Sequence, residues 1–517
     1  MICRLIAPLI LAFALPNAAS AASVWDVQNS INSKIQTVID AENLSPSDIS
    51  TFLNRLSETT AFKAADISKP TSITAPIGIG ARETTWSEEL DVDIVPLELV
   101  LSNLSIQMGA NFHVSLRLAQ VDPQARVLII RSGNFSLQEL KEFADARLSE
   151  GIITREGNRY TAHLPIFIWQ TGGLQITEGD TLLLDQSVGS FVANSGALII
   201  RGGSVSSNNL QNKQLREFKP FITTALMGYT QIVNSKLSHL GFEGYKALKG
   251  ISFSSSVFFA PLGKSFIKNS VLDTVGSLEL NGIAGFVFSQ NIVRASTSNG
   301  IEARESSKID IAHNVFLDSG NHGIKISDGS YQVSIMQNAV LKSNGNGIYV
   351  SNGANIVEAS SNVIAQNARS GLSAQRVACF NAYDNLIASN IGSGITVDSS
   401  FGIELSGNEF VTNKVGAKIS DRLDLGEFKI HDNIFIANGT GVSGSRATGI
   451  SFSKNDFSMQ LPRILGGEFG QYTNSYLDAY EAQKTSFVIP KQQIDNSLIG
   501  SNLPVLAIDR CLEEKGM

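Results

Sequence analysis

The chain is poor in charged residues and in proline for its length. Charged side chains make up 17% of the 517 residues, below the roughly 25% of an ordinary soluble protein. Glycine outnumbers proline by 44 to 13 without a strict glycine triplet, which excludes a collagen chain. A hydrophobic content of 43% excludes an intrinsically disordered chain, and the overall composition excludes a coiled coil. The composition is compatible with a turn-rich β protein that buries a large core.

Cysteine is also scarce, since the chain contains only Cys3, Cys379 and Cys511. Removal of an N-terminal leader would leave Cys379 and Cys511, which are too few for a scaffold held together by disulfides. These two could form one bridge, but we expect two buried thiols.

Long hydrophobic runs are absent except at the N-terminus. Arg4 precedes an apolar run of about eleven residues, and the small residues Ala19, Ser20 and Ala21 follow it. This arrangement predicts a secretory signal peptide over residues 1–21. The run is too short to span a bilayer, and no later apolar stretch reaches about eighteen residues. We therefore expect a periplasmic protein, secreted across the inner membrane and without a membrane span.

The formal net charge is -7, and loss of Arg4 with the leader changes it by one unit, to about -8. An acidic chain argues against nucleic-acid binding and against attachment to an anionic membrane. A negatively charged ligand would therefore have to be bound by locally clustered basic residues.

The second half of the chain repeats. An asparagine recurs every 22 to 25 residues, at Asn291, Asn314, Asn338, Asn362, Asn385, Asn408, Asn433 and Asn455. An apolar residue follows each of them by two positions. A glycine follows the first seven by eight or nine positions, at Gly300, Gly323, Gly347, Gly371, Gly394, Gly416 and Gly441. A second asparagine column contains Asn367, Asn390, Asn413 and Asn438.

A unit of this length cannot bury its own apolar face, whereas stacked units can. The repeat predicts an all-β fold, a right-handed parallel β-helix of about 23 residues per coil in which each coil rises by about 4.8 Å. Asparagine suits the sharp turns because it tolerates the left-handed conformation, and its stacked amides can bond along a ladder. A leucine-rich repeat is excluded because its leucine pattern is absent.

The same pattern continues upstream in a weaker form. Strand segments occur at Leu164–Ile168, Leu182–Leu184, Phe191–Ala193 and Ala197–Ile200. We assign residues 164–470 to the β-helix and 471–517 to a C-terminal cap or tail. Residues 22–70 should form a helical N-terminal segment, and 71–163 a small α+β region that precedes and caps the β-helix.

Two helix-start patterns, a Ser-Pro pair with a following acidic residue and a capping box, predict helices in this N-terminal part. Ser45 with Asp48 begins one helix that runs to residue 56, and Ser136 with Glu139 begins another that runs to residue 148. With β structure between Leu99 and Arg131, these helices should cover the open edge of the first coil.

In each coil the repeated glycine begins a strand whose alternate side chains point outward and align across coils, forming a groove. The first outward row reads Glu302, Lys325, Tyr349, Ser373, Thr396, Lys418 and Ser443, and the second contains Arg304 and Asp398. Cations, hydroxyls and an aromatic ring on an elongated face suit a carbohydrate polymer. The alternative is ordinary solvated surface, which is also polar.

The candidate catalytic residues lie on adjacent coils: Glu302, Arg304, Lys325 and His322. The candidate substrate-binding residues are Lys246, Lys249, Glu305, Tyr349, Asp398 and Lys418. An ordinary surface ion pair is the alternative explanation of the charged residues among them.

The six histidines, at positions 113, 163, 239, 313, 322 and 431, show no ligand spacing with cysteine or carboxylates. We therefore expect neither a metal nor a cofactor. His322 stands just before an outward strand and is a base, a binding residue or a turn histidine. His313 and His431 lie close to repeat asparagines and should be structural or surface residues.

Several segments outside the common coil pattern resemble one protein family. They are Gly189–Gly196, Leu198–Arg201, Phe218–Ile222, Asn234–Phe242 and Lys246–Gly250. These segments are similar to the periplasmic mannuronan C5-epimerases of alginate biosynthesis, and the resemblance extends over residues 127–469. It implies a periplasmic β-helix protein that acts on a uronate-containing exopolysaccharide.

Members of that family convert mannuronate to guluronate by removing the C5 proton and returning one on the other face. The resemblance implies a histidine base in a G-I-D-P-H-D motif and an arginine that neutralises the sugar carboxylate. In this chain the equivalent strand is Gly300–Glu305, so Arg304 stands in the position of the base. Ser327 and Asp328 stand near the position of the arginine.

The sequence leaves several functions open. In C5-epimerisation, Arg304 and Lys325 would neutralise a uronate while Glu302, Glu305, His322 or Tyr349 acts as the base. A polysaccharide lyase begins with the same proton abstraction. A noncatalytic polysaccharide-binding or scaffold protein would have other exopolysaccharide export proteins as partners. A surface adhesin or structural solenoid would need no charged cluster.

Overall fold

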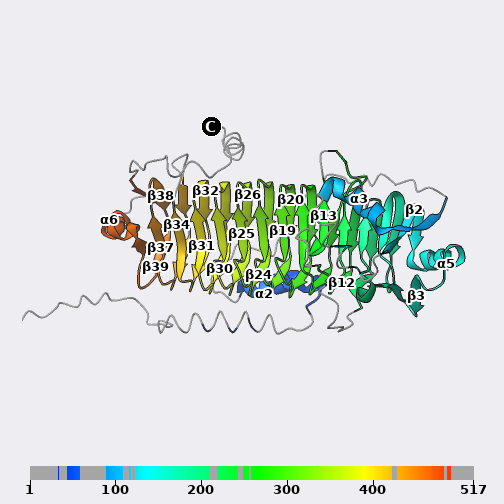
Figure 1. Ribbon diagram of the computed structural model, residues 1–517. Helices are drawn as coiled ribbons and strands as arrows, with labels where there is room; N and C mark the ends of the chain where they lie inside the picture. Colours follow the sequence, from blue (N-terminus) through cyan, green and yellow to red (C-terminus); the bar gives the residue numbers. More distant parts are fainter. Residues whose placement is uncertain are drawn as a thin grey trace, which may run out of the picture.

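The structure is a computed structural model that describes residues 44–58, 89–108, 124–208, 218–242, 248–255, 258–421, 428–482 and 486–490, with single residues 29, 33, 36, 116, 117 and 120. The signal peptide predicted for residues 1–21 and Lys246 lie outside these described residues. The molecule is an elongated stack of β coils with helix α5 near one end and α6 at the other (Figure 1). Among the described residues, no helix is long and apolar enough to cross a bilayer.

Two sheets run the length of the stack. Within the described residues, sheet A has 27 strands and sheet B has 14. One coil contributes two strands to sheet A, β19 (Ile301–Arg304) and β20 (Ser307–Ala312), and one to sheet B, β21 (Val315–Leu317). Neighbouring coils pair in parallel, as Glu302 with Lys325. The parallel β-helix predicted from the repeat is confirmed.

The other coils follow the same order. Their first strands in sheet A are β7 (Val192–Asn194), β10 (Ile222–Thr224), β13 (Gly250–Ser254), β16 (Ser277–Asn281), β22 (Ile324–Ser327), β25 (Ile348–Ser351), β28 (Leu372–Gln375), β31 (Ser393–Asp398), β34 (Val415–Ser420), β37 (Val442–Ser445) and β40 (Leu465–Gly467). Their second strands are β8 (Ala197–Arg201), β11 (Tyr229–Val233), β14 (Phe266–Lys268), β17 (Ala284–Ser289), β23 (Tyr331–Met336), β26 (Asn355–Ser360), β29 (Ala378–Tyr383), β32 (Phe401–Ser406), β35 (Phe428–His431) and β38 (Ile450–Ser453). Sheet B further contains β4 (Arg159–Ala162), β6 (Thr181–Leu184), β9 (Ser204–Ser207), β12 (Lys236–Ser238), β15 (Val271–Asp273), β18 (Ile292–Arg294), β24 (Ala339–Leu341), β27 (Val363–Ala365), β30 (Leu386–Ala388), β33 (Glu409–Val411), β36 (Ile434–Ile436) and β39 (Asp456–Met459).

Parallel pairing begins at β2 (Arg126–Ser136), which pairs with β5 (Ile166–Ile176). It therefore starts one coil before the boundary expected at residue 164. β1 (Asp91–Pro96) pairs antiparallel with β2 and so covers its outer edge, and β3 (Ile153–Glu156) forms a hairpin with β4. The four upstream segments predicted as strands correspond to β5, β6, β7 and β8.

The helix predicted from Ser136 and Glu139 is α5 (Leu137–Arg147). Its capping box is formed, because the Glu139 amide donates to Ser136 Oγ at 3.2 Å and the Ser136 amide donates to Glu139 Oε2 at 2.8 Å. Leu137 and Leu140 are buried in the interior core of the solenoid. α5 therefore covers the first coil, as predicted.

The helix predicted from Ser45 is present as α2 (Ile49–Glu58), after a 3₁₀ turn at Pro46–Asp48. It does not cover the first coil. α2 lies along the outer face of sheet B (Figure 1), where Phe52 shares a buried cluster with Val363. The prediction of an end cap is wrong for this helix because the outward side chains of sheet B are apolar and bury its apolar face instead.

The β structure predicted from Leu99 onward is wrong for its first part, which forms helix α3 (Leu97–Met108). Val100, Leu101 and Leu104 are buried with residue 97, at the spacing of one helical face. α3 packs against β1 and β2, and among the described residues the next strand is β2, which begins at residue 126.

The repeated asparagines form a buried ladder of side-chain amides. Asn314 Nδ2 donates to Asn338 Oδ1 at 3.0 Å and to the Phe288 carbonyl at 2.9 Å, while its Oδ1 accepts the Asn291 amide at 2.9 Å. The predicted ladder is confirmed. In this coil the residue with the left-handed backbone conformation is His313 (φ 55°), which precedes the asparagine. The prediction that the asparagine itself adopts this conformation is therefore wrong.

The repeated glycines are required by the packing of one coil on the next. A Cβ atom on Gly347 would lie 2.6 Å from Ile364 Cγ2 and 2.7 Å from the carbonyl oxygen of Gly371. Ile364 is the apolar residue two positions after Asn362. The glycine recurs in each coil because the apolar side chain of the next coil occupies the space that a Cβ atom would need.

The C-terminal end of the stack is covered by α6 (Thr473–Glu481) and by β41 (Phe487–Ile489). The Tyr476 ring of α6 lies 5.6 Å from the ring of Phe457 in the last coil, centroid to centroid. β41 pairs antiparallel with β38 and so occupies the edge of sheet A.

Cys379 on β29 is buried and disulfide-bonded. The expectation of two free buried thiols is therefore wrong.

Candidate functional site

A continuous row of outward side chains, the first of the two predicted rows, runs along the first strands of sheet A. Strand register places in this outward row, in order, Ile129, Phe167, Ala193, Thr223, Ser252, Glu279, Glu302, Lys325, Tyr349, Ser373, Thr396, Lys418 and Ser443. The first three belong to a buried apolar cluster that contains α3, and charged side chains begin at Glu279. The predicted alignment from Glu302 to Ser443 is confirmed.

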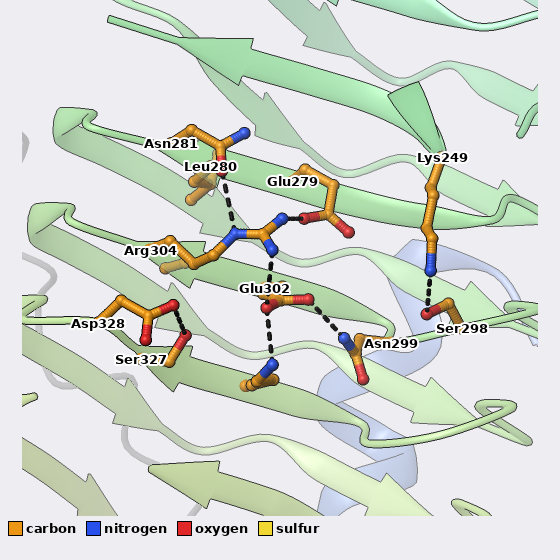
Figure 2. A network of polar contacts seen from close by, with 12 residues as sticks. Lys249, Glu279, Leu280, Asn281, Ser298, Asn299, Glu302, Arg304, Ser327 and Asp328 are labelled. Carbon is orange, nitrogen blue, oxygen red and sulfur yellow. Dashed lines mark hydrogen bonds and ion pairs between the residues drawn. The ribbon is translucent and has the colours of Figure 1, made fainter. Parts of the chain in front are cut away.

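Glu302 is the centre of a network of ion pairs (Figure 2). Lys325 Nζ lies 2.8 Å from Glu302 Oε1, and a terminal nitrogen of Arg304 lies 3.3 Å from the same oxygen. Asn299 Nδ2 donates a hydrogen bond of 2.7 Å to the other carboxylate oxygen. The buried carboxylate is thus held in one orientation by two cations and an amide.

Arg304 joins two coils. Its guanidinium pairs with Glu279 on β16 and with Glu302 on its own strand, and its Nε donates to Asn281 Oδ1 at 3.1 Å. Figure 2 shows the guanidinium between these three side chains. Glu279 is 1% exposed, so burial raises its pKa, and the neighbouring negative charge of Glu302 raises it further. Arg304 itself cannot act as a base, because a guanidinium remains protonated in proteins.

The site is locally positive although the chain is acidic. Lys249 donates to Ser298 Oγ at 3.5 Å, and its charge acts on Glu279. With Arg304 and Lys325, it gives three basic side chains close to the two carboxylates, and the charge of a fourth, Arg369, acts on the neighbouring His322.

His322 belongs to a second ladder, which precedes the first strand of each coil. Asn299 Oδ1 accepts the His322 amide at 3.1 Å, His322 Nδ1 accepts the Asn346 amide at 3.0 Å, and Asn346 Oδ1 accepts the Ser370 amide at 3.0 Å. Burial and the positive charge of Lys325 lower the pKa of His322 to about 4. The imidazole is therefore neutral in neutral solution.

Tyr349 lies beside His322 in the next coil. The two ring centroids are 4.7 Å apart with an interplanar angle of 32°. The Tyr349 hydroxyl donates to Gln375 Oε1 at 2.8 Å. A phenol that donates its own proton to an amide is not poised to accept another.

The structure brings the four predicted catalytic residues together but disperses several predicted binding residues. Glu305 is exposed in the turn after β19, with φ of 50°, and its side chain has no partner among the described residues. Asp398 accepts a hydrogen bond of 2.6 Å from Ser420 on β34. Lys418 is exposed five coils beyond Glu302, about 24 Å away at the usual strand spacing.

Glu279 and Asn299 are parts of the cluster that were not predicted. Glu279 lies one repeat, 23 residues, before Glu302, so extending the repeat by one coil would have found it. The strand glycine is displaced there, since Gly276 precedes Glu279 by three positions whereas Gly300 precedes Glu302 by two. The sequence indicates Asn299 less clearly, because only its spacing of one repeat from residue 322, and of two repeats from residue 346, marks its position.

Comparison with solved structures shows similarity to the crystal structure of the periplasmic alginate epimerase AlgG. The identity is 20% and the TM-score 0.60, and the aligned region covers 74% of this chain and 94% of that chain. A mutant of the same protein aligns with 20% identity and a TM-score of 0.60, over 76% and 96% of the two chains. The resemblance found in the sequence is thereby confirmed for the fold. Comparison with curated protein sequences gives no match.

Residues 264–474 match the family described as periplasmic copper-binding protein (NosD). Copper in proteins is bound by histidine, cysteine and methionine. No three or more His, Cys, Asp or Glu side chains gather as a metal site within the described part of the chain. His322 uses Nδ1 for the Asn346 amide, and His431 pairs with Glu404 and Asp432. These residues do not fit a copper site.

The segments that carry the sequence resemblance have a packing role. Phe218, Phe221 and Phe242 lie in the apolar cluster that covers the N-terminal end of the outward row. The Phe218 ring centroid is 5.5 Å from that of Phe242 and 6.3 Å from that of Phe221. These phenylalanines therefore support the similarity of the fold. They carry no information about the function of the charged cluster around Glu302.

Proposed function

We propose that the protein binds an anionic polysaccharide, one that contains uronic acids, on the outward row around Glu302. The observation that carries this proposal is the gathering of Lys249, Arg304, Lys325 and Arg369 on a chain of net charge -7. A uronate polymer presents one carboxylate per sugar, and ammonium and guanidinium groups bind carboxylates by charge-assisted hydrogen bonds.

The cations of the cluster are more exposed than its carboxylates, which favours the binding of an anion from solvent. The side chains of Lys325 and Arg304 are 25% and 21% exposed, whereas that of Glu302 is 6% exposed. An approaching carboxylate therefore meets the cations before the protein's own carboxylates. Farther along the row, the partly exposed Thr396 offers a hydroxyl for the hydroxyls of the following sugars.

C5-epimerisation of the bound polymer is our second candidate function, because the fold is similar to that of a periplasmic alginate epimerase. Epimerisation and β-elimination both need a base for the C5 proton. Arg304 is a cation, the Nδ1 lone pair of His322 is occupied, and the Tyr349 hydroxyl is a donor. Of the bases expected from the sequence, the carboxylates of Glu302 and Glu305 are left. The two carboxylates inside the cluster, Glu279 and Glu302, are both paired with Arg304, so the geometry favours binding over chemistry.

A periplasmic location belongs to the same proposal. The pattern of the first 21 residues is that of a secretory signal, and both the similar structure and the matching family are described as periplasmic. A protein that binds the polymer there without altering it would act together with other exopolysaccharide export proteins.

Two measurements on the purified protein test the proposal. Incubation with polymannuronate in deuterated water detects any chemistry at C5. Equilibrium dialysis measures the binding of polymannuronate, with a neutral glucan as the control ligand. We expect the protein to retain polymannuronate and not the neutral glucan. We expect neither deuterium at C5 nor unsaturated chain ends in the polymannuronate. Deuterium at C5 without new ends would establish the epimerase instead, and unsaturated ends would establish a lyase. Failure to retain polymannuronate would contradict the proposed function.

A further inference from the structure

His322 has one hydrogen-bonding atom that the protein does not use. Its Nδ1 accepts the Asn346 amide, and a nitrogen that accepts a hydrogen bond carries no proton. The neutral imidazole must therefore carry its proton on Nε2. The side chain is 7% exposed, yet Nε2 has no partner in the described part of the chain and is not one of its fully buried polar atoms. The Nε2 proton thus reaches solvent from an otherwise buried ring.

The preceding coil shows what a donor at this place does. Asn299 occupies the same ladder position, where its Oδ1 accepts the amide of the next coil and its Nδ2 donates to Glu302 Oε2 at 2.7 Å. His322 repeats the acceptor half of this pattern with Nδ1. Its donor half, Nε2, has no carboxylate partner among the residues that the structure describes.

We infer that His322 is a fixed neutral donor, which binds a carboxylate or hydroxyl oxygen of the polysaccharide through its Nε2 proton and is not a proton acceptor. The inference rests on the proposed function, because it assigns His322 a role toward the same polymer. A donor at this place is the opposite of the base that the sequence allowed for His322. A base would need a free lone pair on Nε2, and moving the proton to Nδ1 would set two N–H groups against each other at Asn346.

The surroundings of the ring keep it oriented and neutral. Tyr349 on β25 lies against one side of the ring, and the Asn346 amide fixes its rotation. Lys325 on β22 and Arg369 disfavour the protonated ring, and Glu302 on β19, which favours it, is already neutralised by cations. A donor that is oriented in advance loses little freedom when a ligand binds.

The tautomer can be observed directly in the full-length protein labelled with ¹⁵N-histidine. Signals missing from the spectrum of His322→Asn identify those of His322. We expect a protonated Nε2 and an unprotonated Nδ1 that persist from about pH 5 to about pH 8, and a shift of the Nε2 proton signal when polymannuronate is added. A proton on Nδ1, or titration of the ring within that range, would overturn the inference.

Binding supplies the second test. His322→Asn keeps the ladder acceptor, as at positions 299 and 346, but shortens the reach of the donor. We expect about tenfold weaker binding of polymannuronate with an unchanged melting temperature, whereas His431→Asn, on a second strand of sheet A, should bind as the wild type does. Equal affinity of His322→Asn and wild type overturns the inference alone. Absence of wild-type binding overturns the proposed function as well.

Discussion

Lys325 Nζ lies 2.8 Å from Glu302 Oε1, across two adjacent coils. The two residues are direct neighbours in the outward row, but Glu302 is buried and Lys325 is partly exposed. The lysine therefore stands between solvent and the carboxylate that neutralises it. Because Asn299 holds Glu302 from the other side, a ligand carboxylate can share the lysine without displacing Glu302.

Lys325→Gln should weaken the binding of polymannuronate by about tenfold, because it removes one charge-assisted hydrogen bond to the ligand. The loss should shrink at high salt, which screens the interaction in the wild type. Isothermal titration calorimetry at two salt concentrations measures both effects. Lys429→Ala, an exposed lysine on β35, is the control and should bind as the wild type does. Equal losses in the two variants would contradict a local site.

Arg304→Ala should lower the free energy of unfolding by about 3 to 5 kcal/mol, because it leaves the buried carboxylates of Glu279 and Glu302 without their shared cation. It should also weaken polymer binding. Arg304→Lys keeps the charge but lacks the planar fork, so its stability should be intermediate. Denaturant unfolding of the three proteins tests this order, and a fully stable Arg304→Ala would show that the ion pairs contribute little.

Asn362→Ala should lower the free energy of unfolding by about 3 kcal/mol, since it removes a buried amide with several partners. Its Nδ2 donates to the Ile335 carbonyl and to Asn385 Oδ1, both at 2.9 Å, and its Oδ1 accepts the Asn338 amide at 2.9 Å. Asn474→Ala, on the exposed surface of α6, should change stability by less than about 0.5 kcal/mol. Similar losses in both would contradict the structural role of the ladder.

Glu409 predicts a pH-dependent stability. It is 4% exposed on the apolar outer face of sheet B, and neither of its carboxylate oxygens has a hydrogen-bond partner within the described residues. Burial raises its pKa from 4.5 to about 7. The folded protein therefore holds a proton that the unfolded chain releases, so stability is complete below the unfolded pKa and is lost as pH rises through the folded value.

Glu409→Gln should remove this dependence. Relative to the wild type, it should gain about 2 kcal/mol at about pH 8 and almost nothing at about pH 4. Thermal unfolding over this range, with the exposed Glu481→Gln as control, provides the measurement. A constant difference between variant and wild type at all pH values would contradict the raised pKa.

The period of about 23 residues was enough to predict the parallel β-helix, because register follows from the spacing of Asn314, Asn338 and their equivalents. It also placed Glu302 and Lys325 side by side. The period could not place the N-terminal helices, since an amphipathic helix such as α2 packs equally well on a coil end or on an apolar sheet face. Only the apolar outward side chains of sheet B decide between them.

The candidate site was predictable in position and less so in chemistry. The alternation of side chains along one strand put Arg304 beside Glu302, but its ion pair with Glu279 depends on a coil whose glycine is displaced. The state of His322 depends on the Asn346 amide, a backbone group that side-chain patterns do not reveal. Tyr349 was expected to contact the polymer, and its contact with the His322 ring is a tertiary feature that no local pattern encodes.

The central claim, that this site binds the carboxylates of a polysaccharide, is tested most directly by comparing polymannuronate with the same polymer after methyl esterification of its carboxylates. Titration calorimetry of the wild-type protein should show binding of the acid form and at least about tenfold weaker binding of the ester. Equal affinity for the two forms, or no binding of the acid form, would contradict the account.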